Sequence, residues 1–212
     1  MLYRFYKRTW LRWWSDILKG GAYVKSLQII LDSDGVLVDP ITKLLKLYNE
    51  EYGENLQLSD IKDWDLTKFQ REGTDILKYF RQDGFFRDLE LIEGADYYIK
   101  KMIDDGHDVV IATSSPKEGI LDKIDNIMEN LPFIEEDRII PITRKFLLAG
   151  DIILDDAFHN LINTKCKYPV IYNWEWNKTI PDKYSELNSR VSRVNNWEEF
   201  YELVTDISKR EC

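Results

Sequence analysis

Several short apolar segments of the chain end in acidic or hydroxyl side chains, and stretches with a helical pattern separate these segments. Such segments are typical of buried strands in a parallel sheet, in which helices connect one strand to the next. The side chains that follow the carboxyl ends of parallel strands meet at one edge of the sheet. Three segments end in this way, at Asp32 and Asp34, at Thr113 and Ser114, and at Asp155 and Asp156. We therefore predict an α/β fold with a doubly wound parallel sheet and a functional site at that edge.

The same patterns indicate approximate bounds for each element. Strands are expected at 27–31, 108–112, 138–140, 151–154, 168–172 and 191–194. Helices are expected at 41–52, 67–82, 94–105, 117–130, 158–164 and 197–207. Gly53 and Gly106 follow two of these helices, as expected for residues that end a helix.

Composition excludes several classes of protein. Apolar residues make up 44% of the 212 residues and charged residues 32%, which fits a folded domain and not a disordered chain. Apolar runs are too short to span a membrane, so no transmembrane segment is expected. Two cysteines are too few for a disulfide framework, and we expect a cytoplasmic protein.

The net charge of −9 is unevenly distributed. Residues 1–26 contain six basic side chains and one acidic side chain, a net charge of +5, so the remaining 186 residues carry −14. An acidic body repels a polyanion, and we therefore expect no nucleic-acid polymer as a partner. A small phosphorylated ligand stays possible if a metal ion and a lysine compensate the charge locally.

The motif ILDSDGVLVD at residues 30–39 carries the strongest functional signal. Asp32 and Asp34 directly follow a buried strand, where two carboxylates are costly without a counter-charge. Gly35 permits a tight turn that brings both carboxylates toward one point. A calcium-binding loop does not fit, because it needs an oxygen ligand at Val36 and a later glycine. A purely structural role at the end of the strand is the other interpretation.

Two further motifs and one lysine add to this signal. VVIATSSP at 109–116 supplies hydroxyl and amide groups that suit an anion, and DIILDD at 151–156 ends in a second carboxylate pair. Lys145 precedes that last strand. Four carboxylates at one edge would repel one another unless a divalent cation lay among them, and oxygen ligands favour Mg²⁺. Such a site would suit an anionic substrate that bridges the cation and Lys145. These groups together predict phosphoryl transfer to an aspartate.

Taken together, these motifs resemble the haloacid dehalogenase-like phosphatase superfamily, and within it the 5'(3')-deoxyribonucleotidases. DGVLVD is similar to that family's DGVLAD, and DGFFRDLELIEGADYYIKKM at 83–102 resembles its segment FF-x-x-L-x-P-x-x-GA. Lys145 precedes Asp155 by ten residues, as in the family, and SRVNNWEEF at 192–200 resembles the family's tryptophan-containing end. The resemblance covers residues 27–207.

The resemblance implies a role for each residue at the edge of the sheet. Asp32 would attack phosphorus and become an aspartyl phosphate. Asp34 would protonate the leaving ribose oxygen and then activate water. The ligands of Mg²⁺ would be the Asp32 carboxylate, the Asp34 main-chain carbonyl and Asp156, with Asp155 behind them or bound through water. Three groups would hold the phosphate oxygens, namely Thr113, the Ser114 amide and Lys145.

The resemblance also implies a domain division and a substrate class. Residues 27–40 and 92–212 would form the α/β core, and residues 41–91 a small helical cap. The substrate would be a nucleoside monophosphate, and the motif DWDLTK makes Trp64, Asp65 and Leu66 candidates for contacts with the base. For Trp64 the alternative is a core aromatic of the cap. Two departures from the family concern base recognition, namely Pro40 in place of an aromatic residue and the shortened sequence around Arg144.

Residues 1–26 lie outside the resemblance. Their aromatic residues recur at helical spacing, and Arg4, Arg8 and Arg12 occupy another face, so we expect a helix. This helix could bind a membrane surface or a partner, but we favour packing on its own domain or in a homodimer. Of the two histidines, His107 is expected at the surface and His159 at the start of a helix.

Two alternative functions follow from the same residues. One is a phosphatase for a different small phosphate ester. The other is a non-catalytic phosphate-binding module of the receiver type, which also gathers carboxylates, a hydroxyl and a lysine. Such a module lacks both the DxDG motif and a cap of this length, so we favour the enzyme.

Overall fold

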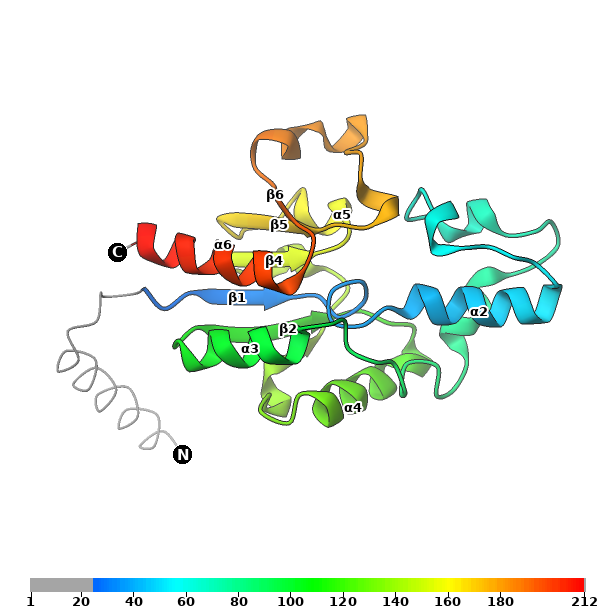
Figure 1. Ribbon diagram of the computed structural model, residues 1–212, viewed down its shortest axis with the longest axis horizontal. Coiled ribbons are helices and arrows are strands. Elements are labelled where there is room, and N and C mark those ends of the chain that lie inside the picture. Colours follow the sequence, from blue (N-terminus) through cyan, green and yellow to red (C-terminus); the bar gives the residue numbers. More distant parts are fainter. Residues whose placement is uncertain (1–24, 212) are drawn as a thin grey trace.

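A six-stranded parallel sheet forms the centre of the computed structural model, which describes residues 25–211 (Figure 1). The strand order is β3-β2-β1-β4-β5-β6. The strands are β1 (Gln28–Leu31), β2 (Asp108–Thr113), β3 (Ile139–Pro141), β4 (Ile152–Asp155), β5 (Tyr168–Tyr172) and β6 (Ser192–Val194). All five pairings are parallel, so the predicted α/β fold with a parallel sheet is confirmed.

Both faces of the sheet are buried, because successive residues of β1 point into different parts of the core. Ile29 and Leu31 belong to the larger apolar cluster, whereas Ile30 belongs to a second cluster on the opposite face. Helices α3 (Ala95–Asp104), α4 (Ile120–Asn130) and α6 (Trp197–Arg210) contribute to the larger cluster, and α5 (Phe158–Leu161) contributes to the second. The sheet is therefore covered on both sides, as the doubly wound arrangement requires.

Strand β1 lies in the middle of the sheet and so carries the first motif into the interior. Ile30 pairs with Val110 of β2 on one side and with Ile153 of β4 on the other. The Asp32 N–H continues this ladder by donating to the Leu154 carbonyl at 2.9 Å. The carboxyl ends of β1, β2 and β4 consequently lie side by side.

The segment after β1 extends beyond the carboxyl ends of the strands, where Figure 1 shows α2 (Pro40–Tyr52) and the turns that follow it. Asp39 caps α2 by accepting the Thr42 N–H at 3.0 Å, and Pro40 occupies the first turn. The predicted single helix at 67–82 is wrong. Two 3₁₀ segments, Leu66–Phe69 and Ile76–Arg81, replace it, because Gly73 between them adopts a φ of +79°.

One further prediction is wrong, two segments were not predicted, and one prediction lies outside the described residues. His107 is buried, against the prediction of a surface position, and its Nδ1 accepts the Leu27 N–H at 3.2 Å. The connection between β5 and β6 contains two 3₁₀ segments that the sequence patterns did not indicate, Glu175–Asn177 and Asp182–Ser189. The predicted helix within residues 1–26, and any dimer contact through it, lies almost entirely outside the described residues. None of the helices in residues 25–211 combines the length and the hydrophobicity that a membrane span requires.

Candidate active site

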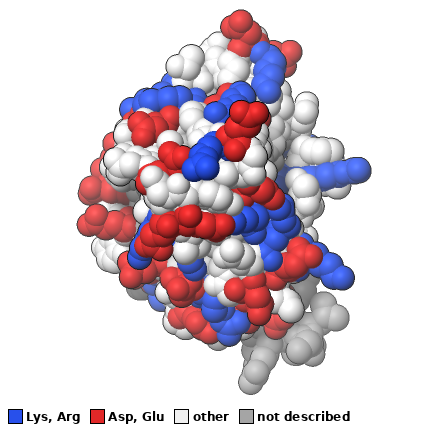
Figure 2. All heavy atoms as spheres, turned by 90° about the vertical axis from the view of Figure 1, so that its right-hand side faces the viewer, with Lys and Arg blue, Asp and Glu red and all other residues white. Residues whose placement is uncertain are grey.

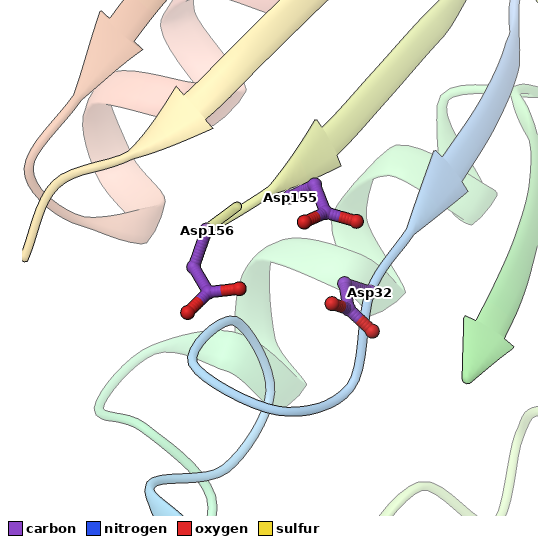
Figure 3. A group of neighbouring side chains, drawn as sticks. All are labelled: Asp32, Asp155 and Asp156. Carbon is purple, nitrogen blue, oxygen red and sulfur yellow. The ribbon is translucent and has the colours of Figure 1, made fainter. Parts of the chain in front are cut away.

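Three buried aspartates meet at the carboxyl ends of β1 and β4. Asp32 directly follows β1, Asp155 is the last residue of β4, and Asp156 comes next in the chain. Each carboxylate places one oxygen within 4.8 Å of an oxygen of the other two. Figure 3 shows the three side chains around the loop that follows β1. The structure thus brings together two motifs that are more than 120 residues apart in the sequence.

The loop after β1 explains the glycine in the first motif. The Ser33 carbonyl accepts the N–H groups of Leu37 at 2.7 Å and Val38 at 3.1 Å, which folds the loop back on itself. Gly35 lies inside this turn with a φ of +70°, and a Cβ atom there would lie 2.6 Å from Asp156 Oδ2. A side chain at this position would therefore push the loop away from Asp156.

Lys145 is the cation of this carboxylate cluster. Its Nζ lies 2.6 Å from Asp32 Oδ2 and 2.8 Å from Asp155 Oδ2, and its side chain is only 2% exposed. Burial lowers the pKa of Lys145, but the charges of Asp155 and Asp32 outweigh this effect and raise it. Lys145 therefore stays an ammonium. Asp155 also accepts the Ala157 N–H at 2.9 Å and two hydrogen bonds from Asn160.

One ammonium leaves this cluster short of positive charge. Burial raises the pKa of Asp32 to about 7, although Lys145 lowers it. Burial also raises the pKa of Asp156 well above its ordinary value, and the charges of Asp155 and Asp32 raise it further. Both shifts indicate that the three carboxylates are not fully compensated by the protein. The oxygen-only donor set fits a hard divalent cation such as Mg²⁺.

Hydroxyl side chains lie at the carboxyl end of β2 and in the residues that follow it. Thr113 is buried, and its Oγ1 has no hydrogen-bond partner among the described residues. Ser115 Oγ and Asp34 Oδ1 are also buried atoms without a partner in this part of the chain. Ser114 is exposed and lines the cavity described below. Unpaired buried polar atoms are unusual. The Thr113 and Ser115 hydroxyls are donors of the kind that a bound anion needs, whereas the carboxylate oxygen of Asp34 is an acceptor.

Lys123 of α4 is a residue of the site that the sequence analysis missed. Its Nζ lies 2.6 Å from Asp34 Oδ2, donates to the Ser114 carbonyl at 2.6 Å, and lies 4.3 Å from the centroid of the Phe86 ring. The side chain is 2% exposed. Its signal in the sequence is a lysine on the apolar face of a helix, three residues after Ile120 and four before Ile127.

A cavity of about 480 Å³ opens above these groups. Its polar residues include Asp32, Asp34, Ser114, Lys123, Lys145 and Asp156. Its apolar wall comes largely from the segment after β1 and includes Pro40, Ile41, Leu66, Leu77, Phe80 and Phe86. Thr113 and Asp155 are buried and are not among the residues that line the cavity. The cavity therefore combines a polar floor with an apolar wall.

The three candidates for base contact all line this cavity, in different ways. Leu66 is buried, whereas Asp65 is exposed and its Oδ1 accepts the Thr67 N–H at 3.1 Å. Trp64 is 58% exposed, so it is not a core aromatic of its segment. Its ring meets the His159 ring edge-on at 4.6 Å between centroids. His159 lies in the first turn of α5, as predicted, and also lines the cavity.

Two tryptophans after β5 are further residues that the sequence analysis did not single out. Trp174 Nε1 donates to the Gly35 carbonyl at 2.7 Å, and Trp176 Nε1 donates to Asp156 Oδ2 at 3.0 Å. The connection between β5 and β6 therefore contacts both loops that carry the aspartates. The only sequence signal is an aromatic pair directly after a strand end.

Comparison with solved structures agrees with the fold. A haloacid dehalogenase family hydrolase from Deinococcus radiodurans, determined with bound phosphate and sodium, superposes with a TM-score of 0.57 over 88% of this chain and 98% of its own, at 14% identity. A haloacid dehalogenase-like protein of unknown function from Agrobacterium tumefaciens superposes with a TM-score of 0.57 over 86% and 99%, at 12% identity. These likenesses support the α/β fold of the superfamily.

Sequence comparison identifies the family. A 5'(3')-deoxyribonucleotidase of Bacillus subtilis is 28% identical over 174 residues, which cover 81% of this chain and 94% of that protein. A 5'(3')-deoxyribonucleotidase of Clostridium acetobutylicum is 28% identical over 171 residues, which cover 80% and 89%. The profile of the family described as 5' nucleotidase, deoxy (pyrimidine), cytosolic type C protein matches residues 25–211. The predicted resemblance and the predicted class of phosphoric monoester hydrolase are thereby confirmed, and the chain belongs to this 5' nucleotidase family.

Proposed function

We propose that the protein is a Mg²⁺-dependent nucleotidase that hydrolyses (deoxy)nucleoside monophosphates to nucleoside and phosphate through an aspartyl phosphate. One observation carries this proposal. The Asp32 carboxylate lies in the polar floor of a cavity that also has an apolar wall, and Lys145 Nζ lies 2.6 Å from Asp32 Oδ2. The floor suits a phosphate group and the wall suits a nucleoside. The names of the Bacillus and Clostridium relatives support the same substrate class.

In the proposed first step, an oxygen of Asp32 forms a bond to phosphorus while the bond from phosphorus to the ribose oxygen breaks. Asp34 donates a proton to that leaving oxygen. In the second step, Asp34 takes a proton from water, and the resulting hydroxide attacks phosphorus, so that phosphate leaves and the Asp32 carboxylate is restored. The Lys145 ammonium and the unpaired Thr113 hydroxyl are suited to hold the phosphate oxygens.

Lys123 is suited to position Asp34 for both proton transfers. It holds Asp34 Oδ2 at 2.6 Å and is itself anchored to the Ser114 carbonyl, while Asp34 Oδ1 keeps no partner in the described chain. The free oxygen can therefore face the leaving group. Because Lys123 also links Asp34 to the turn after β2, it keeps the acid close to the phosphate-binding hydroxyls.

Asp32, Asp156 and the main-chain carbonyl of Asp34 are the proposed ligands of Mg²⁺. When bound, the cation would neutralise carboxylate charge and polarise the phosphoryl oxygens. Asp155 is less suited to direct ligation, since Lys145, the Ala157 N–H and Asn160 already occupy its oxygens. We therefore assign Asp155 the role of holding Lys145, or of binding the cation through water.

The nucleoside is proposed to lie against residues 41–91, the proposed cap, with Trp64, Asp65 and Leu66 as its nearest contacts. Pro40 lines the cavity where the family pattern has an aromatic residue, so we assign the main base contact to the exposed face of Trp64. The division into a core of 27–40 and 92–212 and this cap stays a prediction. So do the homodimer through residues 1–26 and a cytoplasmic location.

The test is phosphate release from a panel of ribonucleoside and deoxyribonucleoside monophosphates, each phosphorylated at the 5' or the 3' position. We expect turnover with Mg²⁺, none after EDTA, and recovery when Mg²⁺ is added back. Turnover of aryl phosphate but of no nucleotide would favour a phosphatase for another small ester. No turnover of either, with phosphate binding intact, would favour a non-catalytic binding module.

A further inference from the structure

Trp176 is almost fully buried beside the carboxylate cluster and is not part of any motif assigned above. It stacks on Trp174 with 4.8 Å between ring centroids and 7° between ring planes. Only 8% of Trp176 is exposed. The two rings therefore form a rigid block next to the loops that follow β1 and β4.

Trp176 and the residue after it, Asn177, each donate a hydrogen bond to Asp156. Trp176 Nε1 donates to Asp156 Oδ2 at 3.0 Å, and the Asn177 side chain donates to the Asp156 carbonyl at 2.8 Å. In residues 25–211, the indole is the only group found to donate a hydrogen bond to the Asp156 carboxylate. The lysine of the cluster, by contrast, binds Asp32 and Asp155.

The other side of Asp156 Oδ2 faces Gly35. A Cβ atom at Gly35 would lie 2.6 Å from Oδ2, so the backbone there is already in close approach. Trp174 Nε1 donates to the Gly35 carbonyl at 2.7 Å and not to the carboxylate itself. Oδ2 is thus enclosed between an indole N–H and a loop, and the carboxylate has little freedom to turn.

We propose that Trp176 is a positioning residue for the divalent cation, because its indole N–H fixes the orientation in which the Asp156 carboxylate faces Asp32 and Asp155. This inference rests on the cation site of the proposed function. An indole is suited to the task, since it donates one hydrogen bond and carries no charge. A lysine or arginine at this place would orient Asp156 equally well but would neutralise the charge that attracts the cation. Hydrogen-bond partners of metal ligands commonly contribute 10- to 100-fold to metal affinity.

The test is Trp176→Phe, which removes the N–H group and keeps a ring on Trp174. Cation affinity is measured on the unliganded protein with Mn²⁺ as the probe, by counting free Mn²⁺ in electron paramagnetic resonance spectra. We expect affinity to fall by about 10- to 100-fold.

The matched control is Trp174→Phe, which makes the same chemical change in the same stack but removes a hydrogen bond to a backbone carbonyl. This control is expected to keep Mn²⁺ affinity within about threefold of the wild type. Circular dichroism in the absence of cation checks that both variants fold.

A second measurement separates positioning from general loosening of the site. The Mg²⁺ concentration for half-maximal phosphate release should rise in Trp176→Phe, while kcat at saturating Mg²⁺ stays close to the wild-type value. Unchanged Mn²⁺ affinity in Trp176→Phe, or an equal loss in Trp174→Phe, overturns the inference and leaves the proposed function intact. Failure of the wild-type protein to bind Mn²⁺ overturns the cation site itself, and the inference with it.

Discussion

At the scale of single residues, Lys145 cannot balance the charge around it. One ammonium lies between Asp32 and Asp155, and the raised pKa values of Asp32 and Asp156 indicate the remaining deficit. A folded protein that keeps such a cluster in its interior stabilises it by another charge. The proposed divalent cation and phosphate would together satisfy the carboxylates and the unpaired Thr113 hydroxyl.

Asp32→Asn tests the covalent step at this scale. The change preserves the shape of the side chain but removes the nucleophile and one proposed cation ligand, so phosphate release should fall to background. Circular dichroism should stay unchanged, because an asparagine side chain of the same size can still occupy the buried site after β1. Retention of more than a few per cent of wild-type turnover would exclude an aspartyl phosphate at Asp32.

Lys123→Met tests the positioning of Asp34. Methionine fills a similar volume but cannot bind Asp34 Oδ2, so kcat for a nucleoside monophosphate should fall by about 10- to 100-fold, within the range of general acid catalysis. An aryl phosphate has a better leaving group and should lose less. Lys117→Met, an exposed lysine just before the same helix, serves as the control. Equal losses on the two substrates would show that Lys123 has no special part in proton transfer.

At the scale of elements, the strand ends and α2 were predictable, and the turns that follow α2 were not. Short apolar runs indicated β1, β2 and β4, and parallel pairing then placed Asp32, Thr113 and Asp155 at one edge. Residues 54–91 lack the regular spacing of apolar residues that indicates a strand or a helix. Their turns depend instead on local caps such as Asp65 and Asp75. The contacts of Lys123 and Trp176 depend on how distant segments pack, which no local pattern encodes.

The segment around Trp64 is tied to later parts of the chain by an ion pair and a ring contact. Lys62 Nζ lies 2.5 Å from Glu175 Oε2, and the Trp64 ring meets His159. If a base stacks on Trp64, Trp64→Ala should weaken nucleotide use by about 1–3 kcal/mol. The comparison of kcat/KM for a nucleotide and an aryl phosphate checks this, since the small ester should change little. A similar loss on both would mean that Trp64 only shapes the cavity.

At the scale of the whole molecule, charge is distributed in a way that suits a small substrate. Residues 27–212 carry a net charge of −14, yet in the face seen in Figure 2 acidic side chains lie beside basic ones. A polyanion would meet mostly repulsion over such a body. A single phosphate needs only the local positive charge of Lys145 and a cation within the cavity.

The pH dependence of folding is a property of the whole molecule to which His107 contributes. Burial lowers the pKa of His107 below its ordinary value of about 6.5, and its neutral Nδ1 accepts the Leu27 N–H at the start of β1. Below pH 6.5 the unfolded chain therefore binds more protons at this residue than the folded protein does. His107 thus stabilises the fold fully above pH 6.5, and this contribution is lost as pH falls through the lowered pKa.

His107→Asn isolates that contribution, because the asparagine Oδ1 can accept the same N–H and does not titrate near neutral pH. Urea unfolding at pH 7.5, 6.5 and 5.5 gives the free energy of unfolding of both proteins. We expect the wild type to lose more stability than the variant between pH 6.5 and 5.5, by at most about 1.4 kcal/mol per pH unit. The difference between the two proteins' plots of unfolding free energy against pH removes the contribution of Asp32 and Asp156, whose titration both proteins share. Parallel curves would mean that His107 titrates alike in the folded and unfolded chains, and the pH sensitivity of the fold would then have to arise elsewhere.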